Sequence, residues 1–313
     1  MSTDYVNPPE SKMSGLLFTE AREGFKGHLG GIRLIEFASD DRRFLCADLA
    51  MGLSLYEDGV LKSSIDLGHD DDKTRATDRI HGIVVSEDGS HAYVAAGLYL
   101  RCIDLNENRE VWRHRSKNFL GFLTSCPRVV GVSKRGDVFV SSDNSIMEVL
   151  SPEGKALAKW KPADAPLMLS RMPNGSAFVG SDSFGLTVWD PDEARRITKI
   201  RTGLYAYGLM AFPTSNNVLV RTIGGVAVFD LLEGSKVAQF PTAPGLPYVD
   251  VSAAEDTILV GHEHGVAIYN LQGELLTVFE HEDKRILTAR FSPSGREVFA
   301  GTDAGTVTRM LLD

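Results

Sequence analysis

The sequence predicts an all-β protein: a single seven-bladed β-propeller with four antiparallel strands in each blade. Three observations support this fold class. A pattern of alternating apolar residues recurs with a period close to 40 residues. Within each copy, short strand-like segments are separated by turn residues such as Gly, Asp and Asn. No helical periodicity separates the segments, which argues against a fold of alternating strands and helices.

Seven hairpin segments carry the repeat. The segments are FLCADLAMGLSLYE, AYVAAGLYLRCID, VFVSSDNSIMEVLS, AFVGSDSFGLTVWD, VLVRTIGGVAVFD, ILVGHEHGVAIYN and VFAGTDAGTVTRML. Each joins two alternating strands by residues that tolerate positive φ or cap a turn, which predicts a β-hairpin. Their closing residues, 39 to 47 positions apart, are Glu57, Asp104, Ser151, Asp190, Asp230, Asn270 and Leu311. This spacing fits four strands per unit, the size of a propeller blade.

The remaining strands predict how the ring closes. A short apolar strand precedes each hairpin, and an outer strand follows each of the first six hairpins. The seventh unit has no outer strand before the chain ends at Asp313. Residues 16–28 can supply it, and this pairing would leave no sheet edge open. We therefore expect residues 1–14 to be a disordered tail and residues 15–313 to form the propeller.

Charge and composition narrow the range of partners. The formal net charge of −9 disfavours general nucleic-acid binding, which needs a basic face, and docking to anionic lipid. The first residues do not resemble a secretory signal, and no apolar run is long enough to span a membrane. The cysteines Cys46, Cys102 and Cys126 are odd in number and lack C-x-x-C spacing. We expect a soluble cytoplasmic protein with reduced core cysteines and with neither nucleic-acid nor membrane partners.

Equivalent positions of the seven units suggest a binding site. The position near the start of each inner strand holds Arg33, His81, Arg128, Leu167, Tyr207, Pro247 and Leu287. The position that closes each second strand is small in six units and is Arg221 in the fifth. Arginine suits bidentate recognition of carboxylate or phosphate. We predict that Arg33, His81, Arg128 and Arg221, together with Tyr207 and Tyr248, bind a small anion or an acidic side chain of a partner. The alternative is that each arginine pairs with a neighbouring carboxylate.

Two histidine-containing segments are candidates for a divalent metal, and no other cofactor is predicted. In residues 68–82, GHDDDKTRATDRIHG, the candidate ligands are His69, Asp72 and His81, since imidazole and carboxylate suit zinc or manganese. The alternative is a solvated acidic loop. In residues 261–265, GHEHG, the side chains of residues 262–264 occupy a hairpin turn, where turn formation is the alternative explanation.

The repeat resembles the WD-repeat and quinoprotein-like propellers across residues 16–313. AFVGSDSFGLTVWD, AYVAAGLYLRCID and LNENREVWRH carry the likeness, with a WD dipeptide at Trp189–Asp190 and Gly-His pairs at Gly27–His28 and Gly68–His69. The resemblance implies a propeller fold whose functional face is built by the outer-to-inner loops and the hairpin turns. It implies no single activity.

Three classes of function are compatible with the sequence. The first is a protein-interaction scaffold or adaptor that uses its loop face, where the apolar segment 116–125 carries Phe119 and Phe122. The second is binding of a small anion at the channel mouth. The third is an enzyme, such as a lyase, hydrolase or oxidoreductase, with its site in the channel, where the inner strands place Glu36 and Asp250 without an evident partner. No catalytic motif favours the third class.

Overall fold

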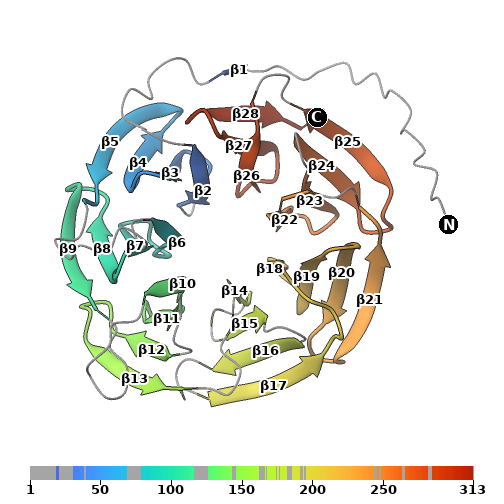
Figure 1. Cartoon of the computed structure of the whole chain (residues 1–313), viewed down its shortest axis with the longest axis horizontal. Helices are drawn as coiled ribbons and strands as arrows, with labels where there is room; N and C mark the ends of the chain where they lie inside the picture. The colour runs from blue at the N-terminus through green and yellow to red at the C-terminus, as the bar shows by residue number, and fades with distance from the viewer. Residues whose placement is uncertain are drawn as a thin grey trace.

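The computed structural model describes residues 19–20, 31–38, 40–68, 79–115, 126–142, 146–161, 166, 168–173, 175, 177–181, 185–190, 193, 195–242, 245–246, 248–262, 265–280 and 284–312. Over these residues the chain forms 28 strands in seven four-stranded sheets. The sheets stand around a central axis as a ring of blades (Figure 1). The predicted seven-bladed β-propeller is therefore confirmed.

The first four blades follow one another along the chain. Blade 1 contains β2 (Ile32–Phe37), β3 (Arg43–Asp48), β4 (Gly52–Glu57) and β5 (Val60–Asp66). Blade 2 contains β6 (Ile80–Val85), β7 (His91–Ala96), β8 (Tyr99–Asp104) and β9 (Arg109–His114). Blade 3 contains β10 (Pro127–Val132), β11 (Val138–Ser142), β12 (Met147–Leu150) and β13 (Ala156–Trp160). Blade 4 contains β14 (Met168–Arg171), β15 (Phe178–Ser181), β16 (Gly185–Asp190) and β17 (Arg195–Arg201).

The last three blades complete the circle. Blade 5 contains β18 (Gly208–Ala211), β19 (Asn217–Thr222), β20 (Gly225–Asp230) and β21 (Ser235–Phe240). Blade 6 contains β22 (Val249–Val251), β23 (Thr257–Gly261), β24 (Gly265–Asn270) and β25 (Leu275–Glu280). Blade 7 contains β26 (Ile286–Phe291), β27 (Glu297–Thr302), β28 (Val307–Leu311) and, from the other end of the chain, β1 (Thr19–Glu20).

The strand β1 closes the ring as expected. It pairs antiparallel with β28, with Thr19 opposite Arg309 and Glu20 opposite Thr308. Figure 1 shows β1 outside β28, in the place that the fourth strand occupies in the other blades. The predicted tail, residues 1–14, lies outside the described residues.

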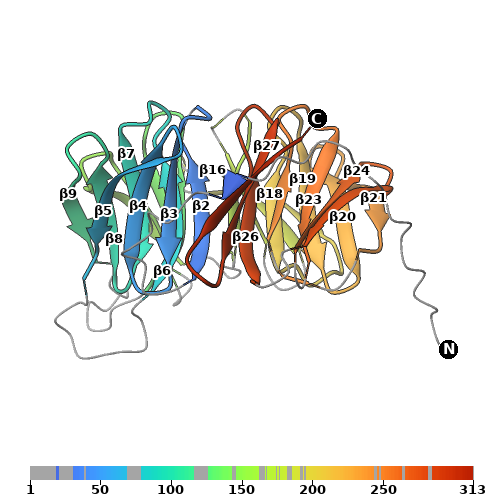
Figure 2. The same cartoon turned by 90° about the horizontal axis from the view of Figure 1, so that it is seen from above.

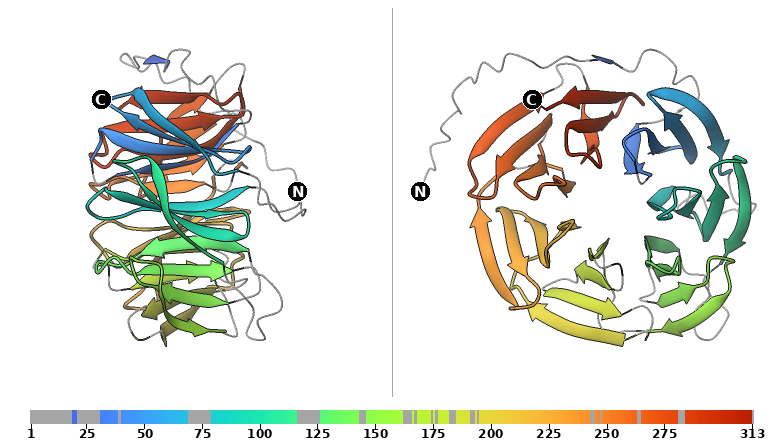
Figure 3. Two further views of the ribbon diagram at one scale, coloured as in Figure 1. Left: turned by 90° about the vertical axis from the view of Figure 1, so that its left-hand side faces the viewer. Right: turned by 180° about the vertical axis from the view of Figure 1, so that it is seen from behind.

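Every inner strand runs in the same direction along the ring axis. Figure 2 and the left view of Figure 3 show the ring edge-on, with the strands crossing its thickness. The inner strands β2, β6, β10, β14, β18, β22 and β26 all begin at one face, which we call the mouth face. The turns between the second and third strands of each blade lie at this face too. The turns between the first and second strands lie at the other face, the opposite face.

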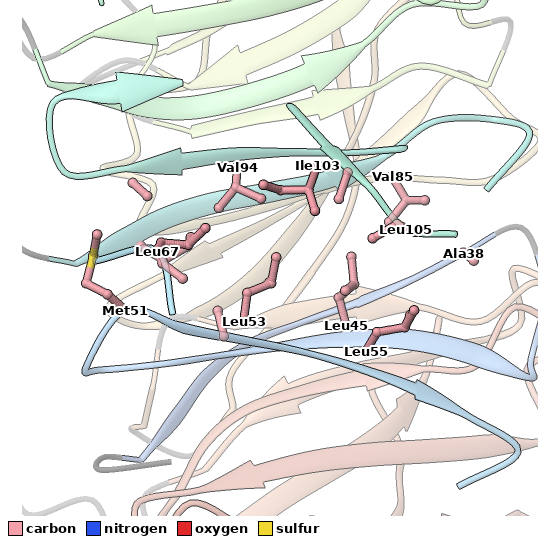
Figure 4. Close-up of a cluster of buried hydrophobic side chains, with 14 residues drawn as sticks. Ala38, Leu45, Met51, Leu53, Leu55, Leu67, Val85, Val94, Ile103 and Leu105 are labelled. Atoms are coloured by element: carbon pink, nitrogen blue, oxygen red, sulfur yellow. The ribbon is translucent and has the colours of Figure 1, made fainter. Parts of the chain in front are cut away.

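The hydrophobic core lies between neighbouring blades. Between blades 1 and 2, Leu45 and Leu53 face Val94 and Ile103, and all four side chains are buried (Figure 4). Burying a side chain of this size stabilises the fold by roughly 1.5–3 kcal/mol. Strands covered by a blade on each side must be apolar on both faces, which explains the nearly continuous burial of β3, β7 and β27.

The three cysteines belong to this core, as predicted. Cys46, Cys102 and Cys126 are buried, and none of them forms a disulfide bond in the described part of the chain. Burial raises the pKa of the Cys102 thiol to about 12, so at neutral pH it is protonated and unreactive. In the part of the chain that the structure describes, no helix is long and apolar enough to cross a membrane.

Candidate functional site

Four inner strands carry a β-bulge at the same place, beside the mouth face. In each of these inner strands, one residue near the start has no partner in the second strand, and the pairing register shifts across it. The residues skipped by the ladder are Arg33 in β2, His81 in β6, Arg128 in β10 and Leu287 in β26. A bulge leaves its extra residue unpaired and turns the side chain away from the regular direction. The bulges therefore present these side chains at the channel mouth.

The four bulge residues line one cavity of about 430 Å³. Its lining includes all four bulge residues and two tyrosines from blades 5 and 6, Tyr207 and Tyr248. Five of the six predicted ligand-binding residues thus line a single cavity, which we call the mouth cavity. The other two members of the aligned row, residues 167 and 247, lie outside the described residues.

Positive charge gathers on the side of the mouth cavity formed by blades 1 to 3. Arg33 and Arg128 are exposed there, and His81 is half-buried between them. Among the residues that the structure describes, neither Arg33 nor Arg128 has a carboxylate within ion-pair distance. Partial burial, together with the nearby charge of Arg79, lowers the pKa of Arg33. A like charge as neighbour means that an anion at this wall would relieve repulsion.

The tyrosines on the far wall present carbon rather than hydroxyl groups. The Tyr207 hydroxyl donates to the carbonyl of Thr222 at 2.6 Å, and the Tyr248 hydroxyl donates to the carbonyl of Gly265 at 2.7 Å. Thr222 is the last residue of β19 and Gly265 the first of β24, so both acceptors flank the turn between the second and third strands of their blades. Because the hydroxyl protons are committed to the backbone, these residues contribute ring surface to the mouth cavity.

Arg221 is placed elsewhere, in the interface between blades 5 and 6. Its side chain is 1% exposed and does not line the mouth cavity. The guanidinium donates to the Thr242 hydroxyl and, at 3.4 Å, to the carbonyl of Gly261. It also lies 5.9 Å from the centre of the Tyr207 ring. Arg221 therefore supports Tyr207 from behind and does not face a ligand directly.

A second level of the channel lies deeper, where one residue of each inner strand faces the axis. These residues are Glu36, Val84, Gly131, Ser170, Met210, Asp250 and Arg290. We call this level the waist. The three charged members come from consecutive blades: Asp250 from blade 6, Arg290 from blade 7 and Glu36 from blade 1. The other four are apolar, small or neutral, so the waist is charged along one arc only.

Arg290 bridges the two waist carboxylates. Its Nε donates to Oδ2 of Asp250 and its Nη1 to Oε2 of Glu36, both at 3.1 Å. Asp250 Oδ2 also accepts the backbone N–H of Phe291 at 2.8 Å. Burial raises the pKa of both carboxyl groups, although Arg290 opposes the shift. Burial lowers the pKa of Arg290, but the two carboxylates outweigh that effect and raise it above its ordinary value.

The sequence showed Glu36 and Asp250 but not their partner. Arg290 occupies the same place in its inner strand as these two residues do in theirs, so the alignment of units contained the signal. That position holds four uncharged residues in the other blades, which made the charges look isolated. The pairing emerges only when the ring brings the last blade against the first.

Most of the predicted metal ligands lie outside the described residues. Nowhere in the described ranges do three His, Cys, Asp or Glu side chains gather closely enough to hold a metal ion. His81 lines the mouth cavity, while residues 69 and 72 lie outside the described residues. In the GHEHG turn, His262 Nδ1 lies 3.8 Å from Glu280 Oε1, and residues 263 and 264 are not described. The apolar segment 116–125, with Phe119 and Phe122, is not described either.

Chemically, the channel offers a cationic mouth, an aromatic far wall and an ion-paired waist. A second cavity of about 530 Å³ continues from the waist toward the opposite face, where Arg171 Nη2 and Glu87 Oε2 form an ion pair at 3.2 Å. No protein-family model matches this chain, and no curated protein matches it either.

Proposed function

We propose that this protein is a non-catalytic binding propeller that takes an anionic group into the mouth cavity. One observation carries the proposal: three consecutive blades use β-bulges to aim Arg33, His81 and Arg128 at one cavity. Within the described part of the chain, both arginines lack an ion-pair partner. Hydrogen bonds from a charged donor contribute about 1.5–3 kcal/mol each, so two such arginines favour carboxylate or phosphate binding.

Titration calorimetry with inorganic phosphate tests this proposal. We expect Arg128→Gln to weaken phosphate binding at least tenfold, because each 1.4 kcal/mol lost is a factor of ten. The matched control is Arg296→Gln, which removes the same charge from an exposed position at the opposite face. If wild type and both variants bind phosphate equally, or none of them binds it, the proposal is wrong.

A second candidate function is protein interaction through the mouth face. Large apolar side chains are exposed at this face, among them Ile223, 81% exposed in the β19–β20 turn, and Tyr205, 49% exposed before β18. Exposed apolar groups at the rim of a polar recess are typical of partner sites. This candidate predicts an adaptor whose partner places an acidic side chain in the mouth cavity.

Cross-linking capture distinguishes this second candidate. The variant with Ile223→Ser and Tyr205→Ser should lose a partner that wild type retains. Leu232→Ser is the control, because Leu232 is 76% exposed in a turn at the opposite face. A partner lost equally by both variants would contradict docking at the mouth face.

We further propose that the protein is related to the WD-repeat-like and quinoprotein-like propellers and acts in the cytoplasm. The seven-bladed fold and the repeat motifs support the relationship. Buried cysteines without disulfide bonds in the described part of the chain are compatible with a reducing compartment. Neither statement bears on which anion is bound.

A further inference from the structure

The two walls of the mouth cavity differ in chemistry. The wall from blades 1 to 3 carries the bulge residues Arg33, His81 and Arg128, of which the two arginines are cationic. The wall from blades 4 to 7 carries Met168 of β14, Tyr207, Tyr248 and Leu287, which is itself a bulge residue. The same kind of bulge therefore presents a basic side chain in three blades and an aliphatic side chain in the fourth.

The aromatic part of this wall is held rigidly. Each tyrosine hydroxyl is fixed by a backbone carbonyl, and Tyr207 is also backed by the buried guanidinium of Arg221. Rings fixed in this way can pack against a ligand at little cost in side-chain entropy. A hydrated inorganic anion would leave this surface unused.

The waist sets the orientation of a ligand. Glu36 and Arg290 line the mouth cavity from below, and with Asp250 they place two carboxylates around one guanidinium. A second negative charge on the ligand, placed at the depth of the waist, would be repelled because two carboxylates there surround one guanidinium. The anionic group is therefore favoured at the rim, and the uncharged part of the ligand is favoured along the apolar wall.

We infer that the natural ligand is a small amphipathic anion, namely an aromatic or similarly apolar body that carries one carboxylate or phosphate group. This inference rests on the proposed anion binding and adds the class of ligand. A cavity of about 430 Å³ is within the range of small-molecule sites, which combine an apolar lining with a few placed polar groups. The charged head contacts Arg33 and Arg128, and the body packs on Tyr207, Tyr248 and Leu287.

The test compares matched ligands by titration calorimetry on the full chain. Phenyl phosphate is compared with inorganic phosphate, and benzoate with acetate, so that head group and body are varied separately. We expect the phenyl compound of at least one pair to bind tenfold or more tightly than its partner. The pair with the larger effect identifies phosphate or carboxylate as the preferred head.

Variants locate the effect. Leu287→Gln and Met168→Gln should each reduce the preference for the phenyl compound severalfold and leave the affinity for the inorganic or aliphatic anion unchanged. Leu232→Gln, at the opposite face, is the control for adding an amide to the protein surface. The wild-type comparison stands by itself if either cavity variant fails to fold.

The outcomes separate the two proposals. If the simple anions bind and the phenyl compounds bind no better, the mouth cavity binds anions and the inferred ligand class is wrong. If none of the four compounds binds, the anion-binding function itself is wrong. If the preference survives in both cavity variants, the apolar contact lies elsewhere and the inference is overturned.

Discussion

Arg290 of β26 donates from Nη1 to Oε2 of Glu36 of β2 at 3.1 Å, although the two residues are 254 positions apart. The bond joins the last blade to the first on the inside of the ring. On the outside, β1 and β28 join the two ends of the chain. The ring is therefore closed both on its inside, by an ion pair that faces the channel, and on its outer edge, by strand pairing.

Replacing Arg290 should destabilise the protein strongly, because the buried Asp250 and the half-buried Glu36 would lose their shared counter-charge. Breaking a buried pair costs about 3–5 kcal/mol, and the 29% exposure of Arg290 reduces this to about 2–4 kcal/mol for Arg290→Gln. Urea unfolding at pH 7 measures the loss. A difference below about 0.5 kcal/mol from wild type would contradict a structural role for the bridge.

The same variant should show a distinctive pH dependence. Without Arg290, burial raises the pKa of both Glu36 and Asp250, and the charge of Asp250 adds to the rise at Glu36, so the folded state favours their protonated forms. A raised carboxyl pKa preserves stability at low pH and loses it as pH rises through the folded-state value. The deficit of Arg290→Gln relative to wild type should therefore shrink from pH 7 to pH 5. Parallel stability curves would contradict this linkage.

Removing β1 should weaken ring closure. Deleting residues 1–20 takes away the strand that covers β28 and leaves an open sheet edge. We expect the melting temperature to fall by about 2–5 °C, as a loss of 1–2 kcal/mol produces in a domain of this size. The matched control deletes residues 1–14 and keeps β1. Identical melting curves for the two deletions would show that β1 contributes nothing.

Gly131 should not tolerate alanine. A Cβ atom at Gly131 would lie 2.4 Å from Cε1 of Phe178, whose ring is fully buried in the interface between blades 3 and 4. Overpacking of this kind costs about 1–3 kcal/mol. Gly224→Ala is the control, since a Cβ there meets no atom within 4 Å. Equal stability of the two variants in urea would contradict the close packing of Phe178 on Gly131.

The Asp88 carboxylate should stabilise the protein at neutral pH and lose this contribution in acid. Hydrogen bonds from the Ser86 hydroxyl and from the backbone and hydroxyl of Ser90 lower the pKa of its carboxyl group to about 2. A lowered pKa gives stability that is present above the unfolded value and is lost as pH falls toward the folded value. Because the side chain is exposed, we expect a contribution of about 1 kcal/mol, lost between about pH 4 and pH 2. Asp88→Asn should lower stability at pH 7 and converge with wild type near pH 2.

Much of the architecture follows from local sequence. Alternating apolar residues and turn residues recur in each hairpin, so strand number, blade order and a closing strand near the start of the chain, seen as Thr19–Glu20, could be predicted without coordinates. Aligning the units also placed Arg33, His81 and Arg128 in one row, and the structure places them in one cavity. Their bulges, however, left no trace in the alignment, because a register shift depends on pairing with the second strand.

By itself, the sequence determined the repeating blade, its seven copies and the residue types that each copy offers to the channel. Only the tertiary structure decided where those side chains point. Arg221, aligned with small residues, turns into the interface of blades 5 and 6, where the Thr242 hydroxyl and the Gly261 carbonyl accept its hydrogen bonds. Glu36 and Asp250 acquire a partner because ring closure brings Arg290 between them. The physical reason is that periodicity encodes local hydrogen bonding, whereas side-chain direction at the channel depends on contacts between blades.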